Sequence, residues 1–155
     1  MATATVYVEF DGSWTLRALQ RAIAELEDPT LLMQEIGEAL LISTRERAAL
    51  EIGPDGVPWA PLSPRYARRK AKLRPGLPKL VFDNQMLGRL AWQADRTQAL
   101  VGTNVPYAAA QQFGRPDINL PARPWLGTDP EDRNEILRLL RKHLELALAG
   151  GGAVP

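Results

Sequence analysis

The stretch that decides the fold is VPYAAAQQFGRPDINLPARPWLG, residues 105–127. Residues 107–113 can place tyrosine, alanine and phenylalanine side chains on one apolar stripe, which predicts a short helix ended by the glycine and proline that follow. Residues 120–126 then form an arm in which Pro121 and Pro124 fix their own φ and keep the preceding residues extended. This pattern predicts a rigid edge strand or polyproline-like rod that lies against another surface. Nothing in the stretch forms a nucleophile–base pair, a metal cage or a phosphate loop, so we interpret it as architecture.

Composition limits the class of protein. With 155 residues and a formal net charge of +1, the chain predicts a single domain over residues 1–149, a flexible tail at 150–155 and no strong field toward nucleic acid or membrane. It has no cysteine and one histidine, His143, which excludes a disulfide framework and thiolate chemistry. We therefore expect no catalytic residue, no cofactor and no metal site. No apolar run approaches the ~20 residues of a membrane span, and the first residues lack signal-peptide features, so we expect a protein made in a cytoplasm without membrane contact.

Three stretches repeat apolar residues every three or four positions, as amphipathic helices do. They are residues 13–26, 29–52 and 130–149, and the last begins with TDPED, a capped start with proline and acids in the first turn. The distal half of the second is expected to expose Arg45, Glu46, Arg47 and Glu51. The expected buried stripes are Leu16, Leu19, Ile23 and Leu26 in the first helix, Leu32, Ile36, Ala39, Leu40 and Ile42 or Ser43 in the second, and Ile136, Leu140, Leu144 and Ala147, widened by Leu137 and Leu148, in the third.

Alternating patterns predict strands in two places. Residues 6–10 are mostly β-branched or aromatic, and residues 90–102 alternate on either side of a turn at Asp95 and Arg96. In this hairpin the expected buried face consists of Trp92, Ala94, Ala99 and Val101. The sequence thus predicts an α+β fold, with long helices on one face of a small, mainly antiparallel sheet made of residues 6–10, the hairpin and the arm.

Two segments suggest contacts with other molecules. Residues 53–64 are rich in proline and glycine, and their Trp59 either anchors this loop on the domain or contacts a partner. Residues 65–79 carry seven of the 19 basic residues and no acidic one, which leaves 12 basic against 18 acidic residues elsewhere. This run is either a solvated face or a surface that faces phosphate groups or an acidic partner. Its members are Arg65, Arg68, Arg69, Lys70, Lys72, Arg74 and Lys79.

Three motifs in fixed order carry a family resemblance. They are GVPWAPLS at 56–63, YAAAQQFG at 107–114 and PARPWLG at 121–127, followed by the terminal amphipathic helix. In this order they resemble the virion morphogenesis, or tail completion, proteins of Mu-like tailed bacteriophages. That family often has phenylalanine where this chain has Trp125. The resemblance implies a structural, non-catalytic protein of the virion neck or upper tail, assembled in the host cytoplasm.

The resemblance also implies partners. Proteins at that place form rings, commonly of six subunits, around the channel through which genomic double-stranded DNA leaves. The expected partners are thus copies of the chain itself, other neck, connector and tail-terminator or tail-tube proteins, and nearby DNA. The basic run of 65–79 is expected to face that channel. The residues expected to contact a subunit or partner are Trp59, Pro61, Leu62, Tyr107, Phe113, Pro121, Arg123, Pro124, Trp125 and Leu126.

Alternatives stay open at this point. The arm packs either on an adjacent subunit or on the edge of its own sheet. Arg123 forms either a salt bridge inside the fold or a bidentate contact to a neighbour's carboxylate. A small nucleic-acid-binding module would use residues 65–79. An enzyme would need Asp11, Asp55, Asp83 and Asp95, which fall in turns where aspartate is expected for backbone reasons.

Overall fold

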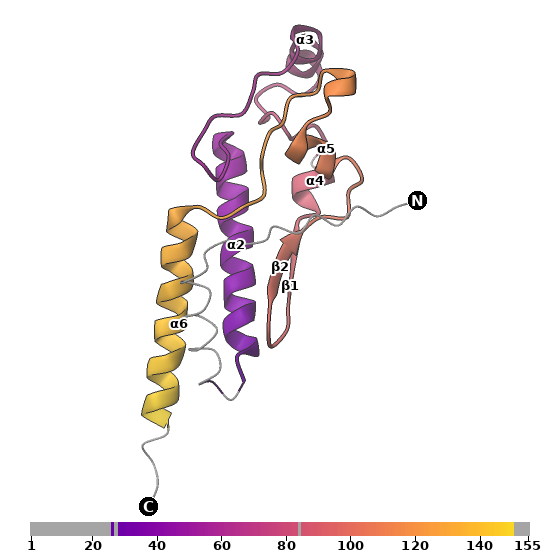
Figure 1. Cartoon of the computed structure of the whole chain (residues 1–155). Helices are drawn as coiled ribbons and strands as arrows, with labels where there is room; N and C mark the ends of the chain where they lie inside the picture. Colours follow the sequence, from indigo (N-terminus) through magenta and orange to yellow (C-terminus); the bar gives the residue numbers. More distant parts are fainter. Residues whose placement is uncertain (1–25, 27, 84, 151–155) are drawn as a thin grey trace, which may run out of the picture.

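A computed structural model describes residues 26, 28–83 and 85–150 (Figure 1). The described part combines helices with a two-stranded antiparallel sheet, which confirms the α+β class. The predicted helix at 13–26 and strand at 6–10 lie almost wholly outside the described residues. In chain order the elements are α2 (Thr30–Leu50), α3 (Pro64–Leu73), α4 (Gln85–Gly88), β1 (Ala91–Ala94), β2 (Ala99–Gly102), α5 (Ala108–Phe113), the 3-10 helix η1 (Pro116–Ile118) and α6 (Pro130–Gly150).

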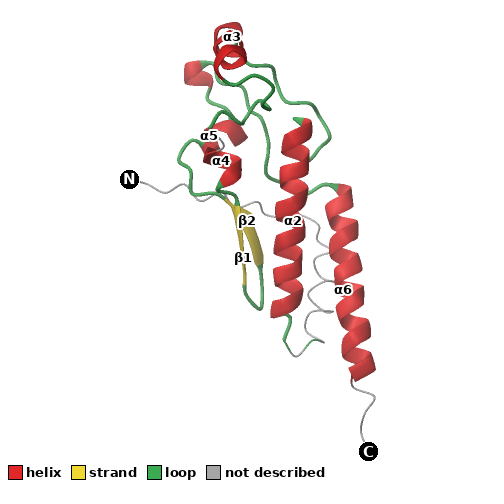
Figure 2. Cartoon of the chain, turned by 180° about the vertical axis from the view of Figure 1, so that it is seen from behind, coloured by secondary structure: helices red, strands yellow, loops and turns green. Residues whose placement is uncertain are grey.

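The two long helices α2 and α6 lie side by side and form the body of the molecule (Figure 2). Leu32, Met33 and Ile36 of α2 pack against Leu139 and Leu140 of α6 in one core cluster. The predicted stripes are largely confirmed, because Ile136 and Leu144 pack against the same cluster. The exceptions are exposed apolar side chains of the predicted stripes: Ile42, Leu137, Ala147 and Leu148.

An aspartate just before each long helix accepts hydrogen bonds from its first turn. The carboxylate of Asp28 accepts hydrogen bonds from the Thr30 amide at 3.0 Å and the Thr30 hydroxyl at 2.6 Å. At α6, Asp129 accepts from the Asp132 amide at 2.7 Å while Asp132 accepts from the Asp129 amide at 3.0 Å. Each cap satisfies amide groups that the first turn of a helix leaves without partners.

Arg47 is buried, although the sequence pattern predicted a solvated side chain. Only 6% of it is exposed, and its Nη1 lies 2.7 Å from both Asp129 Oδ2 and Asp132 Oδ2. Its Nη2 donates to the carbonyl of Gly127 at 2.7 Å. The prediction was wrong because these partners are contributed by the start of α6, far along the chain. Arg47 therefore ties the end of α2 to the start of α6.

The hairpin has the register that its alternation predicted. Trp92 pairs with Val101 and Ala94 with Ala99, so the four residues expected on one face share that face. The Trp92 ring lies directly against Gly37 of α2, where an added Cβ would come within 3.0 Å of it. Amide and hydroxyl hydrogen bonds from Thr97, together with bonds from Gln98, lower the pKa of Asp95 at the turn to about 2. The turn is thus held by its own hydrogen bonds, and the Trp92 contact fixes the hairpin against α2.

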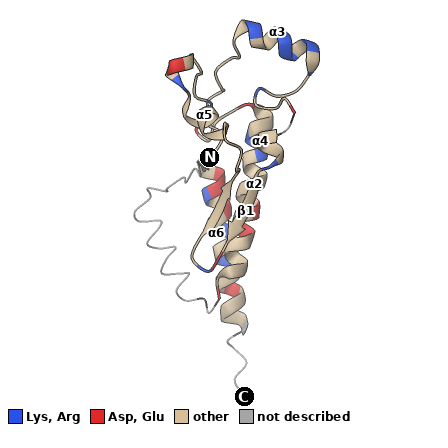
Figure 3. Cartoon of the chain, turned by 90° about the vertical axis from the view of Figure 1, so that its right-hand side faces the viewer, with Lys and Arg blue, Asp and Glu red and all other residues tan. Residues whose placement is uncertain are grey.

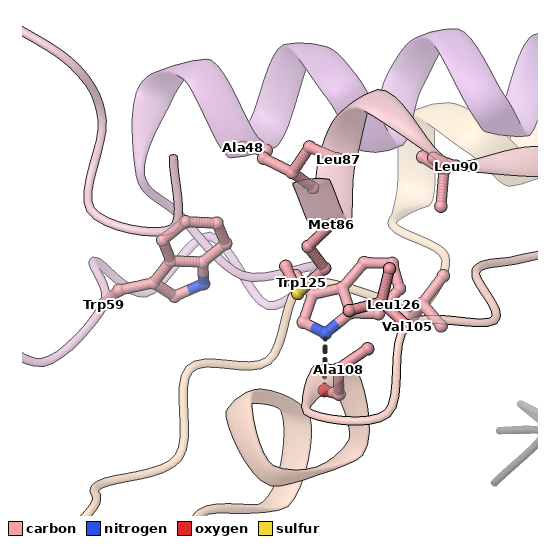
Figure 4. Close-up of a cluster of buried hydrophobic side chains, with 9 residues drawn as sticks. All are labelled: Ala48, Trp59, Met86, Leu87, Leu90, Val105, Ala108, Trp125 and Leu126. Carbon is pink, nitrogen blue, oxygen red and sulfur yellow. Dashed lines mark hydrogen bonds between the residues drawn. The ribbon is translucent and has the colours of Figure 1, made fainter. Parts of the chain in front are cut away.

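The arm is not a strand of this sheet, contrary to the prediction. Within the described residues the sheet contains only β1 and β2, and Leu120 forms a single bridge with Arg115. Residues 121–126 instead run between the loop 53–62 and α5. They help to enclose a second core cluster, shown in Figure 4, which joins the loops to the end of α2. Its members are Ala48, Trp59, Met86, Leu87, Leu90, Val105, Ala108, Trp125 and Leu126.

Candidate functional site

Helix α3 lies at one end of the molecule and carries most of the predicted basic segment (Figure 3). Its first turn is capped by Ser63, whose hydroxyl oxygen accepts from the Tyr66 amide at 3.4 Å, and Pro64 occupies the first helical position. Four basic residues recur at the spacing i, i+3, i+4 and i+7, which places them on one side of the helix. All four are exposed, and none forms an ion pair with a described carboxylate. We call them the α3 cation face: Arg65, Arg68, Arg69 and Lys72.

The other three predicted basic residues have partners inside the chain. Arg74 pairs with Asp83 at 2.8 Å, and Lys79 pairs with Glu51 at 2.8 Å. Lys70 is buried and donates to the carbonyl of Pro78. Burial lowers the pKa of this ammonium group, and Glu51 partly opposes the shift. The prediction that Lys70 faces DNA was wrong, because its side chain lies on the inner side of α3.

A groove of about 660 Å³ opens between the inner side of α3 and the segment 118–121. We call it the α3 groove. Phe82 lies in its wall, with the guanidinium carbons of Arg69 and Arg74 at 6.0 and 5.5 Å from the ring centroid and the Tyr66 ring at 6.2 Å. These are cation–π and aromatic contacts at a surface that remains open to solvent. Other apolar side chains and one phenol line the groove: Leu62, Leu80, Tyr107, Ile118, Leu120 and Pro121.

The arm is fixed by hydrogen bonds within the chain. Arg123 is 3% exposed, and its guanidinium donates to the carbonyls of Ala60 at 2.9 Å and Pro61 at 2.8 Å. It meets no carboxylate of the described residues, so the predicted salt bridge inside the fold is not present there. The indole nitrogen of Trp59 donates to the Pro124 carbonyl at 2.6 Å. This contact confirms the reading in which Trp59 anchors its loop on the domain.

Gln112 explains why YAAAQQFG and PARPWLG occur together. Its Oε1 accepts from the amides of Trp125 and Leu126, both at 2.9 Å, and its Nε2 donates to the Leu126 carbonyl at 3.0 Å. Gly114 ends α5 with φ +74, and a Cβ there would lie 2.7 Å from the Ala122 nitrogen. The arm therefore requires both glutamine and glycine at the end of α5.

Replacing Gln112 with methionine is expected to lower the free energy of unfolding by about 1–3 kcal/mol, because two amides and one carbonyl of the arm lose their partner. Urea denaturation followed by tryptophan fluorescence measures this change. The matched control is Gln93→Met on the exposed side of β1, for which a change within about 0.5 kcal/mol is expected. Equal stability of the two variants would contradict the role assigned to Gln112.

The residues predicted to contact a partner thus divide into two groups. Trp59, Arg123, Trp125 and Leu126 are buried within their own chain, and Leu62 and Pro124 are half-buried. The buried side chains have no free surface to offer to a neighbour. The remaining predicted residues are exposed: Pro61, Tyr107, Phe113 and Pro121.

Several residues of the groove were not among the predicted contact residues, and three of them carry its aromatic and apolar character. Tyr66, Phe82 and Ile118 line it beside the predicted Leu62, Tyr107 and Pro121. Tyr66 and Ile118 are more than one-third exposed, at 38% and 58%. Tyr66 lies three residues after the helix cap inside a basic run, and that placement of an aromatic residue was the available signal.

The described residues contain no cluster of histidine, aspartate or glutamate suited to a metal ion. None of the described helices is long and apolar enough to cross a membrane. The residues brought together at the α3 end therefore offer cationic, aromatic and apolar contact groups.

Comparison with known proteins places the chain in a family. The model of the phage virion morphogenesis family matches residues 11–145. The chain belongs to this family. Among its relatives, this virion morphogenesis protein is 30% identical to the tail completion protein S of Escherichia phage P2, over 74% of this chain and 83% of the relative. It is 29% identical to the putative capsid assembly protein G of Escherichia phage Mu, over 86% of this chain and 92% of the relative.

A further relative is the Mu-like prophage FluMu G protein 2 of Haemophilus influenzae, which is 35% identical over 54% of this chain. The matched region spans 64% of that relative's length. No solved structure matches this virion morphogenesis protein.

Proposed function

We propose that this protein is a structural, non-enzymatic component that completes the phage tail and helps to join it to the head. The observation that carries the proposal is the match to the P2 protein named for tail completion, which covers most of both chains. The Mu relative is named instead for capsid assembly. A protein that acts at the joint between head and tail would be consistent with either name. The position proposed for this chain is accordingly the virion neck or upper tail.

The proposed working form is a ring of copies, six in number, around the channel through which genomic DNA passes. The α3 cation face supports this arrangement, because four cations without carboxylate partners form a surface suited to phosphate groups. The exposed residues of the predicted interface, among them Tyr107, Phe113 and Pro121, are available to neighbouring copies or to other neck and tail proteins.

The function is tested by interrupting the gene in a phage or prophage that carries it and by counting particles in electron micrographs. The expected result is DNA-filled heads and separate tails that do not join, with joining restored by the intact gene. Infectious particles at the wild-type level, or a loss of heads with normal tails, would contradict the proposal.

A small nucleic-acid-binding module is the second candidate, and the α3 cation face is the observation that favours it. The variant R65Q/R68Q/R69Q/K72Q is expected to bind duplex DNA more weakly, because up to four phosphate contacts are lost. The slope of log K against log salt should then fall by up to about 3–4 units. Fluorescence anisotropy over a salt series measures that slope.

The matched control is R133Q/R138Q/R141Q/K142Q, which removes the same number of charges from the exposed side of α6. An equal loss of affinity in both variants would mean that net charge alone attracts DNA. Strong binding by a monomer that leaves head–tail joining unaffected would favour the binding module over the structural role.

A further inference from the structure

The outer side of α2 is apolar and acidic, although α2 already buries its opposite side. Leu31 is 58% exposed and Ile42 is 49% exposed, on the side of the helix opposite Leu32, Ile36 and Leu40. A helix with apolar side chains on two opposite sides usually packs against another surface on each of them.

Two acids share this outer side, since positions 31, 38, 42 and 46 follow the helical spacing. Glu38 and Glu46 are both exposed, and neither forms an ion pair within the described part of the chain. We call Leu31, Glu38, Ile42 and Glu46 the α2 outer stripe.

The α3 groove has the complementary character. Its wall offers Tyr66, Phe82 and Ile118 to apolar side chains, and the guanidinium of Arg69 stands over its Phe82 ring. Residues 65–79 carry seven positive charges and no negative one. Residues 28–51 and 129–150, which contain α2 and α6, hold ten acidic and six basic residues, a net charge of −4.

We propose that the α3 groove of one copy binds the α2 outer stripe of the next copy. This inference rests on the proposed ring and names the contact that builds it. Leucine and isoleucine side chains would enter the aromatic groove, and Glu38 and Glu46 would meet Arg69 and its neighbours on α3. The other members of the α3 cation face do not line the groove and stay available to the channel: Arg65, Arg68 and Lys72.

The distribution of charge sets the symmetry of this contact. An isologous dimer built on α3 would place the same cation faces against each other, where like charges repel. The groove and the stripe are different surfaces, with α3 at one end of the molecule and the start of α2 near the other (Figure 1). Such a heterologous contact leaves a free stripe at one end of a row of copies and a free groove at the other. Further copies can therefore add, and the row closes into a ring where the rotation between copies allows it.

Duplex DNA is a poorer occupant of the groove than a second copy. It offers phosphates to Arg69 but no side chain that would cover the exposed apolar surface of Tyr66 and Ile118. The acidic stripe also repels phosphate. DNA is therefore assigned to the outer cations alone.

The absence of native cysteine allows a direct test. Two single variants keep Arg69 and Glu46 in place: Q85C in the wall of the groove and A49C on α2, about one helical turn after Glu46. They are mixed at low ionic strength and joined with a short bis-maleimide, and the expected product is a dimer of Q85C with A49C. Its yield should exceed by about tenfold that of Q85C mixed with E145C, a control at an exposed glutamate of α6, because one favourable contact of about 1.4 kcal/mol gives that ratio.

A charge-reversal arm tests specificity. E38K introduced into the A49C chain should reduce the dimer about tenfold, and circular dichroism should show an unchanged melting temperature because Glu38 is exposed. A yield equal to that of the E145C control, or Q85C homodimers as the main product, would overturn the inference. So would protection of Q85C by duplex DNA without any Q85C–A49C product.

The inference and the proposed function fail separately. Cross-linking uses the purified full chain and does not depend on head–tail joining, whereas the gene interruption depends on joining alone. If the gene interruption leaves heads and tails unjoined but the cross-link stays at the level of the control, the proposed function stands and the proposed contact is wrong.

Discussion

Arg47→Met is expected to lower the free energy of unfolding by about 3–5 kcal/mol near neutral pH, the usual cost of breaking a buried ion pair by removing one partner. The change leaves the carboxylates of Asp129 and Asp132 without the cation that lies 2.7 Å from each. It also leaves the Gly127 carbonyl without its donor. Urea denaturation of both proteins measures the difference.

The matched control is Arg138→Met on α6. Arg138 pairs with Glu135 at 2.6 Å, but both side chains are exposed, so the loss should stay below about 1 kcal/mol. Restoring neutrality in the triple variant R47M/D129N/D132N should recover part of the stability, because no buried charge then lacks a partner. A loss in Arg47→Met no larger than in the control would contradict the role assigned to the cluster.

The Arg47 cluster also predicts a pH dependence. Burial raises the pKa of Asp129, but the Asp132 amide and the Arg47 guanidinium outweigh it, so the pKa is lowered overall. A lowered native pKa means that the stabilisation is present above the ordinary aspartate value of about 3.9 and is lost as the pH falls below it. In Arg47→Met the Asp129 carboxylate lacks the cation while its burial remains, so protonation of Asp129 stabilises the variant. The stability difference between the two proteins should therefore shrink as the pH falls toward 4, and a constant difference would contradict this account.

Local sequence patterns predicted the helices and the hairpin, whereas the course of the segments that connect them depends on contacts between residues distant in sequence. The alternation around Asp95 determines the hairpin and its buried face, because each strand follows from its own residues. The course of the arm depends instead on Gln112 and on the carbonyls that Arg123 reaches at positions 60 and 61. No local pattern in residues 120–126 encodes those partners.

The candidate site was likewise predictable only in part from the sequence. The basic run of 65–79 is evident in the sequence, but its division into an outer face and internal partners requires the structure. Lys70 directly follows the exposed Arg68 and Arg69 in the sequence, yet its side chain is buried and donates to the Pro78 carbonyl. The groove appears only when Phe82 and Ile118, from separate segments, lie beside α3.

Trp125→Ala is expected to lower the free energy of unfolding by about 3–5 kcal/mol, the range for removing a buried tryptophan from a core. Trp125 is 1% exposed and lies among Met86, Val105 and Ala108 (Figure 4). Its indole nitrogen donates to the Ala108 carbonyl at 3.2 Å, so it also holds the arm on α5. Thermal and urea denaturation measure the loss. Trp125→Phe keeps an aromatic ring and should lose on the order of 1–2 kcal/mol, mainly the hydrogen bond and some packing.

The control for Trp125→Ala is Phe113→Ala, at the end of the α5 helix on which the arm is held. Phe113 is 67% exposed, so its loss should change the stability of the monomer by no more than about 0.5 kcal/mol. If Phe113 contacts a neighbouring copy or another neck protein, Phe113→Ala should reduce assembly while folding is retained, whereas Trp125→Ala should reduce both together. Comparing soluble yield, melting temperature and head–tail joining for the two variants therefore separates a residue that builds the fold from one that serves the particle. A large destabilisation by Phe113→Ala, or none by Trp125→Ala, would reverse these assignments.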